Sequence, residues 1–153
     1  MADANIPGAL NLEVVTPGRE VVRDTVSEIQ LPGRAGYLGI LPGHTPLLTE
    51  LGIGALSYKK SAQTFYVAIL GGFAEVLPDR VIVLAEAAER SDEINAESAR
   101  AALAEAEKKL ASSTSDPAID SQGILQSIAS ERVRLEVASH GTSGSSPTRQ
   151  EPH

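Results

Sequence analysis

The spacing of apolar residues changes once along this chain of 153 residues, near residue 89. Before that point, short runs rich in β-branched side chains alternate apolar and polar positions, and turn residues such as Thr16-Pro17-Gly18 separate them. Such alternation with frequent turns is typical of antiparallel strands. The runs that predict strands are 10–15, 19–31, 53–59, 64–70, 73–77 and 81–85. We therefore expect residues 1–88 to form an antiparallel β-sandwich, with the Gly71-Gly72 pair at a bulge or sharp bend.

Beyond residue 89 the apolar spacing is that of an α-helix. The first helical stripe, at spacings of three and four, consists of Ala96, Ala99, Leu103, Ala106 and Leu110. Asn95 is placed to cap this helix, and Lys108 and Lys109 lie near its C-terminal end, where positive charge favours the helix dipole. A helix-breaking stretch at 112–117 is followed by a second stripe of Ile124, Leu125, Ile128, Leu135 and Ala138. The pattern predicts an antiparallel two-helix hairpin over residues 89–138.

The amino-acid composition argues against several kinds of partner and site. A formal net charge of −7, 3% aromatic residues and no Trp argue against nucleic-acid binding, which needs a basic face and stacking rings. Zero cysteines exclude disulfides and thiolate metal sites. The most apolar stretch, 67–77, is too short to span a bilayer, so membrane association is expected only through partners. The segment 139–153 has no apolar residue to anchor it, and we expect a disordered tail.

The stretch from Gly36 to Leu48 reads Gly-Tyr-Leu-Gly-Ile-Leu-Pro-Gly-His-Thr-Pro-Leu-Leu. Its three glycines can adopt positive φ or admit a neighbouring backbone, and its two prolines fix φ and remove donors. The leucines and the isoleucine supply apolar surface. The combination predicts a tightly specified turn system, with short strands entering and leaving it.

This stretch resembles the epsilon subunit of the rotary (F-type) ATP synthase, whose family carries Gly-x-Leu-Gly-Ile-x-Pro-Gly-His-x-Pro-Leu-Leu. Three further segments, 71–76, 81–88 and 99–102, are similar to family segments and occur in the family's order. The resemblance covers nearly everything except the tail. It implies a β-sandwich followed by a helical hairpin, in a non-catalytic central-stalk subunit of a bacterial-type enzyme that couples ion-driven rotation to ATP synthesis.

By the same resemblance, the sandwich packs against the gamma subunit and sits on the c-subunit ring, at the cytoplasmic face of the membrane. The rotor-contact candidates are Tyr37, Leu38, Gly43, His44, Thr45 and Pro46. The family often has an acidic residue where this chain has Tyr37, so an ionic contact is not expected there. The alternative is that these residues only shape the sandwich, with His44 satisfied by local backbone groups.

The hairpin offers mostly alanine methyl groups for packing, so we expect its docking on the sandwich to be marginal, as a switch requires. The resemblance implies that it can extend toward the alpha and beta subunits and inhibit ATP hydrolysis. The candidates to meet acidic segments of beta are Arg100, Lys108, Lys109, Arg132 and Arg134. The alternative is that these are solvated charges making weak pairs within the helices.

Some family members bind ATP through Ile or Leu followed by Asp-x-x-Arg-Ala. This chain has Asn95 and Ser98 in place of the acidic residue and the arginine. Without the guanidinium no bidentate phosphate or ribose contact forms, so we expect weak or absent ATP binding.

No nucleophile elbow, phosphate loop or dinucleotide fingerprint occurs, and no ligand-spaced cluster accompanies His44. We therefore expect no catalytic, cofactor or metal residues in the chain. One other function class fits the periodicities equally well, a stand-alone β-sandwich interaction module with a dimerising helical hairpin. It does not explain four motifs in family order.

Overall fold

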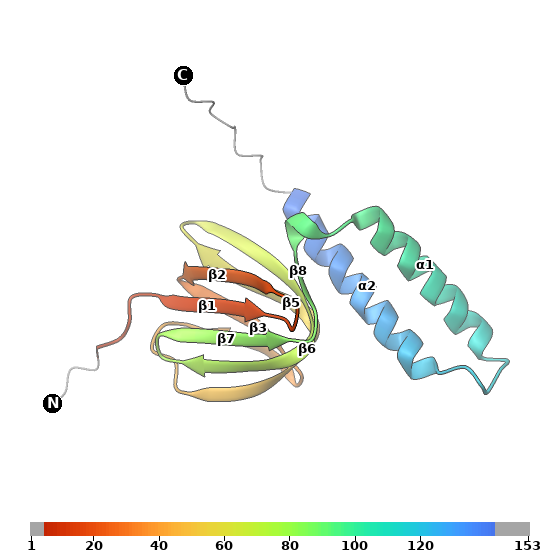
Figure 1. The fold of residues 1–153 in the computed structure, drawn as a ribbon, viewed down its shortest axis with the longest axis horizontal. Coiled ribbons are helices and arrows are strands. Elements are labelled where there is room, and N and C mark those ends of the chain that lie inside the picture. The colour runs from red at the N-terminus through yellow and green to blue at the C-terminus, as the bar shows by residue number, and fades with distance from the viewer. Residues whose placement is uncertain (1–4, 143–153) are drawn as a thin grey trace, which may run out of the picture.

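The structure is a computed structural model, and it describes residues 5–142. Eight strands precede two long helices in this part of the chain (Figure 1). The strands are β1 (Leu10–Val15), β2 (Glu20–Val26), β3 (Glu28–Gly33), β4 (Gly36–Ile40), β5 (Leu47–Lys60), β6 (Gln63–Leu77), β7 (Arg80–Ala85) and β8 (Ala88–Arg90). The helical elements are a 3₁₀ turn η1 (Ser91–Glu93), α1 (Ala96–Ser113) and α2 (Ser121–Thr142). The predicted sandwich followed by a two-helix hairpin is confirmed.

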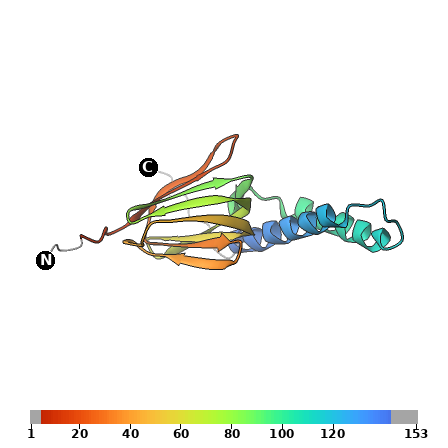
Figure 2. The same cartoon turned by 90° about the horizontal axis from the view of Figure 1, so that it is seen from below.

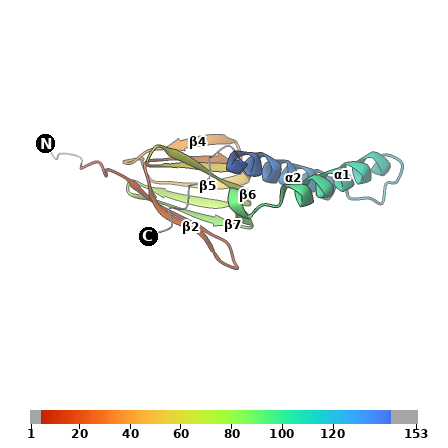
Figure 3. The same cartoon turned by 90° about the horizontal axis from the view of Figure 1, so that it is seen from above.

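The strands follow the order β2-β1-β7-β6-β5-β3-β4, and β8 pairs with β6. Figure 3 shows how this sheet folds over into two layers, with the hairpin extending from one end. All neighbouring strands are antiparallel except β1 and β7, which are parallel. The expectation of a purely antiparallel sandwich is therefore wrong for one pair. No tight turn connects β1 to β7, so hairpin geometry does not set their direction.

Strand β6 belongs to both layers because it bends at its two glycines. Val67 and Ile69 face the core before the bend, whereas Ala74 and Val76 face it afterwards, so the inward positions change from odd to even numbers. Gly71 and Gly72 have φ angles of 81° and 133°, a region that L side chains rarely adopt. The predicted bend is confirmed, but the two predicted strands on either side of it form one continuous strand.

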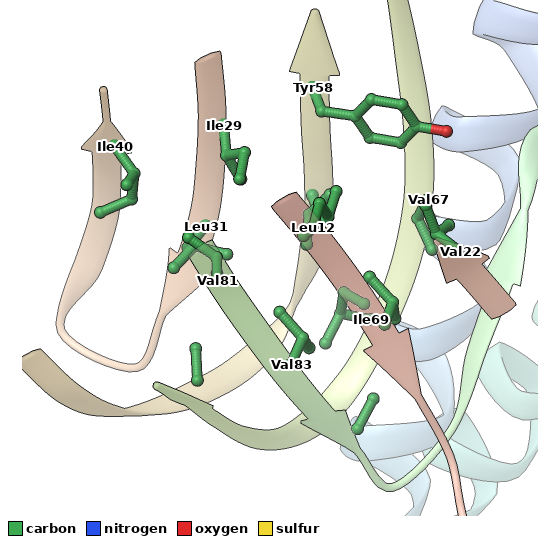
Figure 4. Close-up of a cluster of buried hydrophobic side chains, with 14 of the residues drawn as sticks. Leu12, Val22, Ile29, Leu31, Ile40, Tyr58, Val67, Ile69, Val81 and Val83 are labelled. Atoms are coloured by element: carbon green, nitrogen blue, oxygen red, sulfur yellow. The ribbon is translucent and has the colours of Figure 1, made fainter. Parts of the chain in front are cut away.

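The core is aliphatic, as the composition requires. Figure 4 shows side chains from both layers converging on it, with Tyr58 as its aromatic member. The labelled members are Leu12, Val22, Ile29, Leu31, Ile40, Tyr58, Val67, Ile69, Val81 and Val83. Among residues 5–142 no polar or charged side chain is buried. Hydrophobic burial therefore accounts for this core without internal ion pairs.

The helical hairpin begins at its predicted cap and ends beyond its predicted limit. Asn95 accepts a hydrogen bond from the Ser98 N–H at 3.0 Å, which caps α1. Helix α1 continues to Ser113, so no basic residue lies in its last turn. Helix α2 continues to Thr142, which corrects the predicted tail boundary at 139 by four residues. The rest of the predicted tail lies outside the described residues.

Helix α2, rather than α1, carries the hairpin's contact with the sandwich (Figures 1 and 2). Val137 is fully buried and packs with Ala55 of β5 and Ala68 of β6. The half-buried residues Tyr66, Ile94 and Val133 surround this small cluster. The alanines of α1 that the sequence analysis placed in its stripe pack toward α2 instead, with Ala99 and Ala106 buried.

Candidate functional site

The turn that follows β4 is fixed by bonds within the loop and to a neighbouring turn. The Gly43 N–H donates to the Pro78 carbonyl oxygen at 2.8 Å, and the His44 N–H donates to the Leu41 carbonyl oxygen at 3.2 Å. The His44 Nδ1 atom lies 2.6 Å from the Thr45 carbonyl oxygen. The imidazole is thus satisfied inside the loop, as the local alternative for His44 expects. Gly43 has a φ of 86°, whereas Gly39 keeps an ordinary φ.

Tyr37 lies far along β4 from this turn and has a structural role of its own. Its hydroxyl accepts a hydrogen bond from the Ala55 N–H at 3.3 Å, where the register of β3 and β5 shifts between Gln30 and Gly33. A shift of this kind leaves a ladder N–H without its usual partner, and the tyrosine oxygen takes that place. The side chain nevertheless remains 60% exposed.

The six rotor-contact candidates therefore do not form one patch. Tyr37, Gly43, Thr45 and Pro46 are exposed, and His44 is half-buried. Leu38 packs against the core and offers little surface to a partner. What remains is the exposed Tyr37 ring on β4 and, separately, a hydrogen-bonded turn at 41–46 whose Leu41 side chain is 59% exposed.

The structure adds an exposed apolar surface that the sequence analysis missed. Phe73 of β6 pairs across strands with Leu84 of β7, and these side chains are 54% and 58% exposed. Leu84 is in turn paired with Val15 of β1, while Leu48 of β5 and Ile82 of β7 both pair with Glu75. We call Val15, Leu48, Phe73, Ile82 and Leu84 the outer apolar face.

A sequence signal for this surface exists in the uninterrupted apolar run from Val81 to Ala85. A sandwich strand with one solvated face alternates apolar and polar residues, whereas a continuous apolar run indicates a strand covered on both faces. Val81 and Val83 face the core, so Ile82 and Leu84 point to the opposite face of β7, where the apolar run predicts a partner.

Val15, Leu84 and Phe73 are neighbours across three strands, whereas Glu75 separates Leu48 from Ile82. Exposed apolar neighbours of this kind mark a protein interaction site.

Two arginines, Arg19 and Arg90, bind Glu93 in the segment between the sandwich and the hairpin. Both Nη atoms of Arg19 contact the two carboxylate oxygens of Glu93, at 2.6 and 2.7 Å. This bond from Arg19 is the main reason why the pKa of Glu93 falls to about 2. Arg90 donates to the Val21 carbonyl oxygen at 3.0 Å and also pairs with Glu93.

A second cluster joins the hairpin to the sandwich. The Arg134 Nε atom of α2 lies 2.6 Å from a carboxylate oxygen of Glu89 in β8, and its Nη1 atom lies 2.9 Å from Glu131. The His140 ring stacks on Tyr66 of β6, with centroids 3.7 Å apart. Beside this stack lies a half-open cleft of about 860 Å³, lined by both domains and by the segment between them.

The five inhibitory-contact candidates differ in their surroundings. Arg100, Lys108 and Lys109 project from α1 and make no salt bridge within residues 5–142. Arg132 makes one long pair, 3.6 Å from Glu107, and its side chain is 67% exposed. Arg134 is only 19% exposed and is engaged by two carboxylates. Arg134 thus cannot meet a partner while the hairpin is docked.

The described part of the chain holds no group of three or more metal-ligating side chains. Within the same residues, no helix is long and apolar enough to cross a bilayer. Asn95 and Ser98 stand where the ATP motif has its acidic residue and its arginine, and the Asn95 side-chain oxygen accepts from the Ser98 backbone N–H.

Comparisons with known proteins agree on one family. The model of the family described as ATP synthase, Delta/Epsilon chain, beta-sandwich domain, matches residues 9–91. The chain is 53% identical over 131 residues to the ATP synthase epsilon chain of Koribacter versatilis strain Ellin345, a match that covers 86% of this chain and 91% of that protein. It is 50% identical over 104 residues to the ATP synthase epsilon chain of Solibacter usitatus strain Ellin6076, covering 68% and 78%.

Solved structures show the same architecture. A chain in the cryo-EM structure of the Euglena gracilis mitochondrial ATP synthase, comprising OSCP, F1 and c-ring, is similar with a TM-score of 0.67 at 25% identity. That match covers 94% of this chain and 85% of the other. A chain from the central stalk and c-ring of the Tetrahymena thermophila mitochondrial ATP synthase shares the fold, with a TM-score of 0.51 at 14% identity over 87% of this chain and 96% of that one.

Proposed function

Since this chain belongs to the family of ATP synthase epsilon chains, we propose that it is the non-catalytic subunit that fastens the central stalk to the rotor ring. In this role it couples ion-driven rotation to ATP synthesis. The observation that carries the proposal is the outer apolar face, which lies within the stretch that matches the family's sandwich domain. A subunit that turns with its partners needs a permanent, largely apolar interface.

We assign the two kinds of exposed surface to different partners. The outer apolar face, with Phe73 and Leu84 at its centre, fits the gamma subunit, because a stable stalk contact requires buried apolar area. The turn at 41–46 fits the loops of the c-subunit ring, because its fixed backbone loses little conformational entropy on binding. Tyr37 offers an aromatic rather than an ionic contact to the ring. The subunit would then be held peripherally at the cytoplasmic face of the membrane.

Binding to a gamma subunit tests this assignment. Phe73→Asp and Leu84→Asp place a charge at the centre of the outer apolar face, and we expect each to weaken co-purification with gamma by about 100-fold or more. Leu125→Asp is the matched control, because Leu125 is 52% exposed but lies on α2. Equal binding by all three variants would contradict the assignment. If the isolated chain forms a dimer and does not bind the gamma subunit, the result would support the stand-alone interaction module instead.

The hairpin is proposed as an inhibitor of ATP hydrolysis. Its support is the small contact with the sandwich and the exposed cations Arg100, Lys108, Lys109 and Arg132, which suit acidic segments of the beta subunit. Replacing Lys108 and Lys109 by Gln should raise ATP hydrolysis by the assembled enzyme. The matched control replaces Lys59 and Lys60 of the sandwich in the same way. If hydrolysis responds equally to both pairs, the cations of the hairpin are not inhibitory contacts.

ATP binding by the isolated subunit is expected to be weak or absent. Asn95 and Ser98 lack the carboxylate and guanidinium of the family's motif. The side-chain oxygen of Asn95 already accepts from the Ser98 backbone N–H, which caps α1. Calorimetry with ATP on the full chain measures this directly. Tight binding would show that other residues compensate for the two changes.

A further inference from the structure

A single carboxylate, that of Glu75 in β6, lies among the side chains of the outer apolar face, and it is exposed. Glu75 is paired across strands with Leu48 of β5 on one side and with Ile82 of β7 on the other. Along β6, Phe73 lies two positions before it and Leu77 two positions after it, on the same face of the sheet. The carboxylate therefore has apolar residues at the four adjacent positions of this face.

Nearby acidic residues of the same face already have basic partners. Glu50 of β5 and Glu13 of β1 lie at the margins of the outer apolar face. Glu50 forms a salt bridge with Arg34 at 2.6 Å, and Glu13 forms one with Arg23 at 2.7 Å. Glu75 makes no salt bridge and no side-chain hydrogen bond within residues 5–142. Its charge is therefore compensated only by water in the isolated chain.

One cation of this chain lies near Glu75 by strand register. Arg80 of β7 pairs with Leu77, and its side chain is exposed. In the part of the chain that the structure describes, no salt bridge joins Arg80 to Glu75. Pairing of these two residues when a partner docks is the alternative to a cation supplied by the partner, and replacing Arg80 distinguishes them.

A partner that covers the outer apolar face must also cover Glu75. Leu48 and Ile82 lie on opposite sides of the carboxylate, so a surface that contacts both leucine and isoleucine displaces the water between them. A carboxylate buried without a partner strongly disfavours binding. A carboxylate that meets a cation instead favours one register of docking and disfavours surfaces without that cation.

We propose that Glu75 determines which surface of the gamma subunit docks, by pairing with a lysine or arginine that gamma presents within an otherwise apolar surface. The inference rests on the proposed contact between gamma and the outer apolar face, and it names the chemistry of that contact. The partner's cation lies between the groups that cover Leu48 and Ile82. Surfaces that are apolar throughout, or acidic at this point, leave the carboxylate unpaired and are rejected.

Replacing Glu75 by leucine gives opposite results for the two kinds of partner surface. If gamma presents a cation, Glu75→Leu leaves that cation buried and unpaired, and the affinity of the full chain for gamma should fall at least about tenfold. Glu75→Gln should weaken binding to a similar degree, because it keeps the shape and removes the charge. If gamma presents only apolar groups, Glu75→Leu should strengthen binding through added apolar contact. Stronger or unchanged binding by Glu75→Leu would overturn the inference.

Two matched variants control for the loss of charge. Glu50→Gln makes the same change at the margin of the face, where Arg34 already compensates the carboxylate, and it should alter the affinity by less than about threefold. Arg80→Gln should also have little effect. If it weakens binding as much as Glu75→Gln does, the pair forms within this chain and the inference is overturned. The unfolding temperature of Glu75→Gln should equal that of the parent, because the carboxylate has no partner within the described residues.

An exchange of charges identifies the partner's residue. Glu75→Lys should weaken binding to gamma by about 100-fold or more, because two cations then meet in the interface. When the lysines and arginines of gamma are replaced by glutamate one at a time, one replacement should recover at least about tenfold of this loss. Recovery by none of them would overturn the proposed pair.

These outcomes are separable from the proposed function. If Phe73→Asp abolishes binding to gamma while Glu75→Leu strengthens it, gamma binds the outer apolar face but supplies no cation to Glu75. If Phe73→Asp and Leu84→Asp both bind gamma normally, the proposed gamma contact itself is wrong.

Discussion

A side chain at Gly72 would collide with the backbone of β7, because a Cβ atom there would meet the Leu84 carbonyl oxygen and lie only 2.8 Å from the Ala85 Cα atom. Gly72 also has a φ of 133°, so L side chains are strained there in any case. The bend of β6 that forms the two layers therefore depends on the absence of a side chain at this position.

Gly72→Ala should accordingly destabilise the sandwich by about 3 kcal/mol or more, since both backbone strain and a clash oppose it. Gly39→Ala is the matched control, because nothing lies within 4 Å of a Cβ atom there and its φ is ordinary. That variant should change the unfolding free energy by less than about 0.5 kcal/mol. Denaturant unfolding of both variants measures the difference, and similar values would show that β6 can bend without glycine.

Acid should weaken the ion pair between Arg19 and Glu93 in a defined range of pH. The pKa of Glu93 is about 2 in the folded chain against 4.5 for the free side chain. A lowered pKa means that the stabilisation is complete above about pH 4.5 and disappears as the pH falls toward 2. The loss in unfolding free energy caused by Glu93→Gln should therefore be present at pH 7 and shrink through this range. A difference for Glu93→Gln that stays constant through this range would contradict the lowered pKa of Glu93.

The sequence predicts the strands and helices well where periodicity and turn residues agree. Five of the six runs expected before residue 88 lie within observed strands, and Asn95 caps α1 as expected. The sixth, 19–31, is wrong as a single strand, because it breaks at Ser27 into β2 and β3. The Gly71-Gly72 pair indicates a bend, but only the structure shows that the inward positions change parity across it. The alternation of apolar and polar residues on either side of the glycines does not show which positions face the core after the bend.

The contacts that make the candidate sites were harder to predict, because they depend on distant pairing. The sequence places His140 in a tail, since the residues around it offer no apolar anchor, yet its ring stacks on Tyr66. The sequence gives Arg134 the same character as the exposed cations, because no pattern within α2 points to Glu89, 45 positions away. Val137 lay outside the expected stripe for the same reason, since its environment is the sandwich rather than α1.

The Tyr37 hydroxyl should contribute to stability independently of any rotor contact. Tyr37→Phe removes the acceptor of the Ala55 N–H, and we expect a loss of about 1 kcal/mol in unfolding free energy. Tyr66→Phe is the matched control, because within the described residues its hydroxyl makes no hydrogen bond and only its ring is in contact. Since the exposed aromatic side chain is retained, Tyr37→Phe should leave binding to the c-subunit ring unchanged. Weaker binding to the c-subunit ring without a loss of stability would show that the hydroxyl contacts the partner instead.

The cap at Asn95 should decide how firmly the first turn of α1 is formed. Asn95→Ala removes the oxygen that accepts from the Ser98 N–H, and such losses cost about 1 kcal/mol of helix stability. Asn95→Asp keeps an equivalent acceptor and should be close to neutral. Hydrogen exchange at the Ser98 amide measures the effect, and it should accelerate about fivefold in Asn95→Ala alone. Equal acceleration in both variants would show that the amide group of Asn95, rather than its oxygen, holds the turn.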